Sequence, residues 1–64
     1  MQSQSINIMV TLTDDQAWQY AQFLKRVSFN EYRNNASNDD EAYLMRAAGQ
    51  LIREALASQG YAPR

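Results

Sequence analysis

The stretch that decides the expected fold is Ser5-Ile6-Asn7-Ile8-Met9-Val10-Thr11-Leu12, which is followed directly by Thr13-Asp14-Asp15-Gln16. Aliphatic residues occupy every second position of the first segment, and this period of two is typical of a half-buried β-strand. Thr13 with Gln16 three residues later forms the capping-box pattern that begins a helix. The stretch therefore predicts one strand that leads into a helix. The inward face of the strand is expected to hold Ile6, Ile8, Val10 and Leu12.

A first helix is expected to follow this strand without a linker. Two carboxylates fill its first turn, where the positive end of the helix dipole favours negative charge. The helix is expected to run to about Val27, with Tyr20 and Phe23 assigned to the core. A second capping pattern, Ser28 with Glu31, predicts a kink that is followed by one or two further helical turns.

A second helix is expected from Asn38 to about Ser58. Gly60 is a suitable C′ residue for its end, and Pro63 prevents the helix from continuing. Apolar residues recur with helical spacing and predict one broad apolar face, made of Leu44, Met45, Ala48, Leu51, Ile52, Ala55 and Leu56. The opposite face is expected to hold Arg46, Gln50 and Arg53.

The length of the chain limits how much surface a single copy can bury. The chain has 64 residues, and a domain of this size buries only about 60% of its unfolded surface. Small domains usually gain stability from a disulfide, a metal or a partner subunit. The sequence contains no cysteine and no histidine. Self-association is therefore the expected source of additional burial.

The order strand, helix, helix predicts a mainly α fold with one β-strand. Residues 1–4 are expected to form a flexible tail, and residues 5–62 a single β-α-α domain. Two copies can pair their strands about a two-fold axis, with four helices beneath, as in ribbon-helix-helix proteins. This homodimer would satisfy the unpaired backbone groups of the strand. A helical hairpin whose strand pairs only with a foreign partner is an alternative, and other oligomers also stay open.

A ribbon-helix-helix fold suggests DNA binding through the outward face of the strand, here Asn7, Met9 and Thr11. Asparagine and threonine can read base edges. However, the strand carries no lysine or arginine, although phosphate neutralisation supplies much of the affinity of such proteins. Three carboxylates at positions 39–41 also stand where a phosphate would bind. DNA binding is therefore disfavoured, and a transcriptional repressor is kept as the alternative function.

Composition argues against catalysis, a metal site and a membrane location. The carboxylates at 14–15 and 39–41 lie in expected first helical turns, so helix capping explains them without chemistry. No glycine-rich phosphate loop and no Ca²⁺-loop spacing is present. No apolar run approaches the ~20 residues that span a bilayer. We expect no enzymatic activity, no cofactor and no metal, and a cytoplasmic protein.

Aromatic residues favour a surface for another protein. The chain has one Trp, four Tyr and two Phe, which is more than a two-helix core needs. Aromatic residues beside arginine commonly anchor protein interfaces. Burial of these aromatics in the homodimer interface is the alternative. The predicted partner-binding residues are Trp18, Phe29, Tyr32, Tyr43 and Arg46.

A resemblance rests on four segments, LTDDQAW (residues 12–18), AQFLKRV (21–27), DEAYLMR (40–46) and GYAPR (60–64). Together they resemble a family of short proteins from proteobacterial phages and prophages, and the similarity covers residues 6–64. That family has no assigned activity, so no residue role carries over. The resemblance implies a bacterial host and a small phage protein that binds and modulates a host protein by occlusion. A defence system such as a CRISPR complex is one such target, and a subunit of a phage assembly is a third interpretation.

Overall fold

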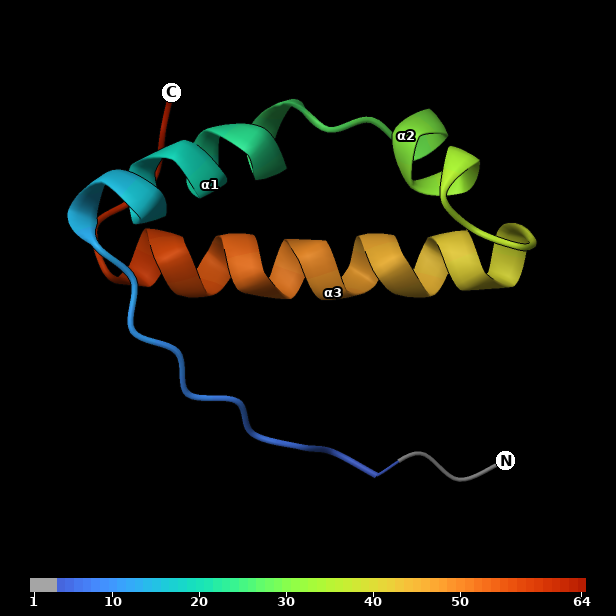
Figure 1. The fold of residues 1–64 in the computed structure, drawn as a ribbon, viewed down its shortest axis with the longest axis horizontal. Helices are drawn as coiled ribbons and strands as arrows, with labels where there is room; N and C mark the ends of the chain where they lie inside the picture. Colours follow the sequence, from blue (N-terminus) through green and yellow to red (C-terminus); the bar gives the residue numbers. More distant parts are fainter. Residues whose placement is uncertain (1–3) are drawn as a thin grey trace.

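Within residues 4–64 the protein consists of three helices, whose arrangement Figure 1 shows. The structure, a computed structural model, describes residues 4–64. α1 spans Asp14–Arg26, α2 spans Phe29–Asn34 and α3 spans Asp39–Ser58. α1 and α2 follow one another along the same side of α3, so each packs on a different half of the longest helix. Most of the predicted tail, residues 1–3, lies outside the described residues.

The prediction of a β-strand over residues 5–12 is wrong. No residue from 4 to 64 forms a strand, and residues 5–12 run as an irregular, outstretched segment away from α1 (Figure 1). A strand exists only within a hydrogen-bonded ladder, and no described residue supplies the second half of one. The alternation of Ile6, Ile8, Val10 and Leu12 marks residues that need apolar contacts, but it does not create a ladder. The β-α-α class and the ribbon-helix-helix homodimer paired through this strand are corrected to an all-helical chain.

The two main helices begin where the sequence predicts. Thr13 caps α1: its Oγ1 accepts the backbone N–H of Gln16 at 3.1 Å, and its own N–H donates to Oε1 of Gln16 at 3.0 Å. Asn38 caps α3, because its side-chain oxygen accepts the N–H of Glu41 at 2.9 Å. Each cap satisfies backbone donors that have no partner inside the helix.

The kink expected at Ser28 is a full break between two separate helices. The N–H of Ser28 donates to the carboxylate of Glu31 at 2.9 Å, which fixes the start of α2. The turn from α2 into α3 is held by Arg33. Its Nε donates to Oδ1 of Asp39 at 2.7 Å, and its Nη1 donates to the carbonyl of Ala36 at 3.1 Å. These two contacts of Arg33 fix the orientation of α3 relative to α2.

The hydrophobic core is small. Three of its five buried apolar side chains are alanines, so the helices approach closely but bury little apolar area. Tyr20 and Phe23, which the sequence assigns to the core, are instead exposed and stack on each other with ring centroids 5.6 Å apart. The buried apolar residues are Ala17, Ala21, Leu24, Ala42 and Leu56.

The buried face of α3 agrees with the predicted one at Leu56 but differs elsewhere. Ala42, Gly49 and Leu56, spaced seven residues apart, are its buried positions, while Leu44 and Leu51 are exposed. α1 and α2 thus pack against some of the smallest residues of α3, where helices can approach closely. The predicted polar face instead lines the junction with α1 and α2, through Arg46, Gln50 and Arg53.

The C-terminal segment folds back onto α1. Gly60 has a φ of 100°, and the N–H of Tyr61 donates to the carbonyl of Leu56 at 2.9 Å, as in a Schellman motif. The predicted end of α3 is therefore confirmed. The ring of Tyr61 meets Trp18 edge-on with centroids 5.1 Å apart, and its hydroxyl donates to Asp14 at 2.6 Å. These contacts join two segments that lie 47 residues apart in the sequence.

Candidate functional site

A polar groove lies where α1 ends, α2 begins and the middle of α3 passes beneath them. Its volume is about 280 Å³. Aromatic, cationic and neutral polar side chains dominate its wall. We name it the aromatic–basic groove, and its lining residues are Leu24, Lys25, Val27, Ser28, Phe29, Tyr32, Arg46, Gly49, Gln50 and Arg53.

Two aromatic rings in contact, tilted by 32° to each other, lie at the edge of this groove. Phe29, the first residue of α2, is half-buried and lies against Tyr43 of α3 with ring centroids 4.8 Å apart. Tyr43 remains 58% exposed, so much of its side chain is free to contact another molecule. The ion pair between Arg33 and Asp39 joins α2 and α3, the two helices that carry these rings. The aromatic pair is therefore held in place before any partner arrives.

Three cations line the same groove and have no carboxylate partner. Within residues 4–64 the one ion pair joins Arg33 to Asp39, so Lys25, Arg46 and Arg53 are unpaired. Lys25 lies in the last turn of α1, where the helix dipole favours a cation. Arg46 and Arg53 lie inside α3, and no such end effect explains them. The groove is thus locally cationic on a chain whose formal net charge is −1.

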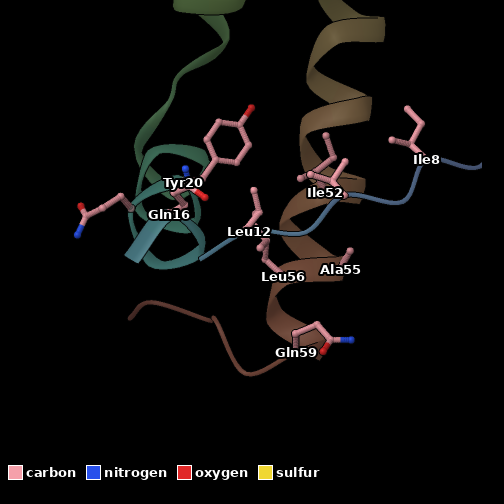
Figure 2. A pocket seen from close by; sticks show the side chains of 10 residues that line it. Ile8, Leu12, Gln16, Tyr20, Ile52, Ala55, Leu56 and Gln59 are labelled. Carbon is pink, nitrogen blue, oxygen red and sulfur yellow. The ribbon is translucent and has the colours of Figure 1, made fainter. Parts of the chain in front are cut away.

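A larger groove lies between the outstretched segment, α1 and the second half of α3 (Figure 2). Its volume is about 830 Å³, and none of its lining residues carries a charge. Figure 2 shows Leu12 between Tyr20 of α1 and Ile52 of α3. We name it the apolar groove, and its lining residues are Ile8, Val10, Leu12, Gln16, Gln19, Tyr20, Ile52, Ala55, Leu56 and Gln59.

Most carboxylates near the helix starts are engaged in local contacts. Asp14 accepts the hydroxyl of Tyr61, Asp39 pairs with Arg33, and Glu41 accepts the backbone N–H of Ser37 at 3.1 Å. Among residues 4–64, no group of three or more His, Cys, Asp or Glu side chains could hold a metal ion. In the same part of the chain, every helix is too short or too polar to cross a membrane.

One titratable side chain is clearly perturbed. The hydrogen bond that Tyr61 donates to Asp14 raises the pKa of the phenol, and desolvation and the carboxylate charge act in the same direction. The hydrogen bond stabilises the neutral phenol, because the phenolate could not donate it. Tyr61 therefore serves as a structural donor and not as an acid or base near neutral pH.

One family model matches residues 1–64, the whole chain. The chain belongs to a family of unknown function, DUF7706. No curated protein and no solved structure matches it. Membership of DUF7706 gives no residue a role, so any function has to be argued from the two grooves.

Four of the five predicted partner-binding residues of this DUF7706 chain come together. Phe29, Tyr32 and Arg46 line the aromatic–basic groove, and the ring of Tyr43 contacts that of Phe29. Trp18 lies apart, because it packs against the C-terminal segment at the other end of α3.

The residues of the alternative DNA interface lie elsewhere in this DUF7706 chain. Asn7, Met9 and Thr11 are exposed in the outstretched segment, and Met9 is 98% exposed. No lysine or arginine precedes Lys25 in the sequence. Residues 5–12 thus form no strand ribbon and carry no lysine or arginine.

The sequence prediction included Arg46 but missed Lys25 and Arg53 of the aromatic–basic groove, and it missed the whole apolar groove. Arg46 and Arg53 are seven residues apart and therefore share one face of α3, which was predicted to lie opposite the apolar face. The signal that could have indicated a site was the absence of any carboxylate between Arg46 and Arg53 in the sequence. Ile52 was assigned to a buried face, but in the DUF7706 structure it lines an open groove.

Proposed function

We propose that this chain is a non-catalytic protein-binding module that holds an acidic segment of another protein in the aromatic–basic groove. The observation that carries the proposal is the aromatic pair Phe29 and Tyr43 beside three cations that have no carboxylate partner among the described residues. Aromatic side chains and arginine are the residue types that most often anchor protein interfaces. The unpaired cations favour a partner that supplies carboxylates.

The groove suits a peptide more than a small substrate. Arg46 and Arg53 can each grip a carboxylate through two parallel N–H donors, which is a directional contact as well as a charged one. Tyr43 offers an apolar ring that ends in a polar hydroxyl, and it loses little side-chain entropy on binding because Phe29 already supports it. Binding by these groups would occlude the partner segment and needs no chemical step.

The proposed partner is a protein of the bacterial host. This part of the proposal is supported by the resemblance to short phage and prophage proteins. A small phage protein could bind an acidic segment of a host protein. It would then modulate that host protein by occluding the segment. Defence complexes, CRISPR effectors among them, are the first purified targets to test.

The first experiment is affinity capture from nuclease-treated bacterial lysate, followed by the dissociation constant of each captured protein. Tyr43→Ala is expected to weaken binding by at least about tenfold, because it removes an exposed aromatic anchor at the edge of the groove. Leu44→Ala is the matched control: Leu44 is exposed, neighbours Tyr43 on α3 and does not line the groove. Its affinity should equal that of the wild type.

Charge reversal tests the acidic character of the partner. Arg46→Glu should abolish the interaction, whereas Arg26→Glu, at an exposed arginine that does not line the groove, should leave most of the affinity. Equal losses in both variants would mean that only the overall charge matters. Wild-type affinity in Tyr43→Ala and Arg46→Glu together would overturn the proposal.

A further inference from the structure

A single copy of the chain exposes more surface than a folded monomer of its mass. Its accessible area is 5636 Å², whereas a compact monomer of 7.4 kDa exposes about 4,200 Å². The radius of gyration is 13.0 Å, against about 10.7 Å for a compact domain of this length. The chain therefore exposes about 1,400 Å² more accessible surface than a compact monomer of this mass, and we call this excess the uncovered area.

Part of this uncovered area belongs to aliphatic side chains that line the apolar groove. Ile8 is 75% exposed, Val10 is 64% exposed and Ile52 is 46% exposed, and all three line one continuous groove. Removing apolar surface from water is worth about 25 cal/mol per Å². Exposed aliphatic side chains that gather on one groove therefore favour an apolar cover.

We propose that a second copy of this chain covers the apolar groove, so that the protein works as a homodimer. Each subunit of a standard interface buries about 800 Å², which the uncovered area of this chain exceeds, and obligate dimers bury more. The groove carries no charge, so two identical copies can meet there without repulsion. Because every copy carries the same groove, a two-fold arrangement covers both grooves at once.

This dimer uses side-chain contacts and no sheet. Ile8, Val10 and Leu12 of one copy bury their side chains against the groove of the other, and the backbone of residues 5–12 needs no ladder. The aromatic–basic groove shares no lining residue with the apolar groove. The dimer would therefore leave two partner grooves open, and the inference stands or falls independently of the proposed function.

Sedimentation equilibrium tests this inference on a matched pair of variants. The wild type should sediment at about twice the 7.4 kDa chain mass at micromolar concentration. Ile52→Glu places a charge in the groove and should raise the dimer dissociation constant about a hundredfold or more, since the change enters a two-fold interface twice. Leu51→Glu makes a similar change on the adjacent residue, which is 67% exposed and outside the groove, and should leave the dimer intact.

A second variant keeps the test valid if Ile52→Glu fails to fold. Ile8 lies outside every helix, so Ile8→Ser should keep the helical circular dichroism signal and still weaken the dimer. A wild type that stays a folded monomer at high micromolar concentration would overturn the inference. Dissociation by Leu51→Glu with no effect of Ile8→Ser would also overturn it, because the interface would then lie elsewhere.

Discussion

At the residue scale, Gly49 determines how closely α2 approaches α3. A Cβ at this position would overlap the hydroxyl of Tyr32 and come within 3.2 Å of its Cζ. Glycine inside a helix costs about 1 kcal/mol relative to alanine. Its presence in the middle of α3 is therefore explained by the aromatic ring that lies over it.

The first prediction concerns this contact. Gly49→Ala should lower the free energy of unfolding by about 1 kcal/mol. The overlap with Tyr32 destabilises the fold by more than the higher helix propensity of alanine stabilises it. In a Tyr32→Phe background the closest atom is gone, and the same substitution should be neutral or stabilising. Urea denaturation of the four chains in this cycle measures both values. A wild-type background that is stabilised by Gly49→Ala would show that the ring does not press on α3.

The second prediction concerns Tyr61, whose pKa is raised by the hydrogen bond to Asp14. A raised pKa means that the contact contributes its full stability below about pH 10, where the unfolded tyrosine is still protonated. This contribution is lost as the pH rises through the folded value. Alkaline titration of Tyr61 by NMR should show its pKa falling in Asp14→Ala.

The adjacent carboxylate supplies the control for this titration. Asp15→Ala removes a charge from the same helical turn, but Asp15 makes no hydrogen bond to Tyr61. The pKa of Tyr61 should therefore stay raised in that variant. An equal fall in both variants would assign the effect to the overall charge of the turn and not to the hydrogen bond.

At the element scale, the cap of α1 gives the third prediction. Thr13→Ala removes the hydroxyl that accepts the N–H of Gln16 and should cost about 1 kcal/mol of stability. Thr13→Ser keeps the acceptor and should cost much less. Thermal or urea unfolding measures the difference. Equal losses in the two variants would mean that the methyl group, and not the cap, stabilises α1.

Helix boundaries could be predicted from the sequence because caps are local. Thr13, Asn38 and Gly60 each act on backbone groups a few residues away, so their patterns are visible in a single sequence. The buried face of α3 could not be predicted in this way. The buried face depends on where α1 and α2 pack against α3. They pack at Ala42 and Gly49, two small residues that a hydrophobic pattern does not single out.

The strand failed as a prediction for a related reason. Alternation in residues 5–12 reports which side chains prefer apolar contact, whereas a strand also needs a partner in a ladder. The candidate site was predicted in part: the aromatic residues were chosen for their size, and four of the five residues do gather. Arg53 was missed because a cation on an amphipathic helix is usually solvated, and only the docking of α1 turns it into a groove residue.

At the scale of the whole molecule, the chain is flat. Its shortest dimension is 16 Å and its longest is 35 Å, so the helices lie nearly in one layer, as Figure 1 shows. A single layer of helices has few positions that are covered on all sides. This geometry explains why so few large side chains are buried.

The fourth prediction follows from this shape. If a second copy completes the core, folding and association are coupled, and Tm should rise with protein concentration. The rise should persist in Leu51→Glu and disappear in Ile52→Glu, which lines the apolar groove. Scanning calorimetry over a wide concentration range measures it. A Tm that is independent of concentration in the wild type would contradict a coupled dimer.

The aromatic–basic groove is the proposed partner site, and an NMR footprint tests that claim most directly. The captured partner would be added to the ¹⁵N-labelled chain, and the shifts of its backbone amide signals would be mapped onto the structure. The largest shifts are expected at Phe29, Tyr43, Arg46 and their neighbours, while signals of the apolar groove stay unchanged. Shifts confined to residues 5–12 and the end of α3, with none near Tyr43, would contradict the claim.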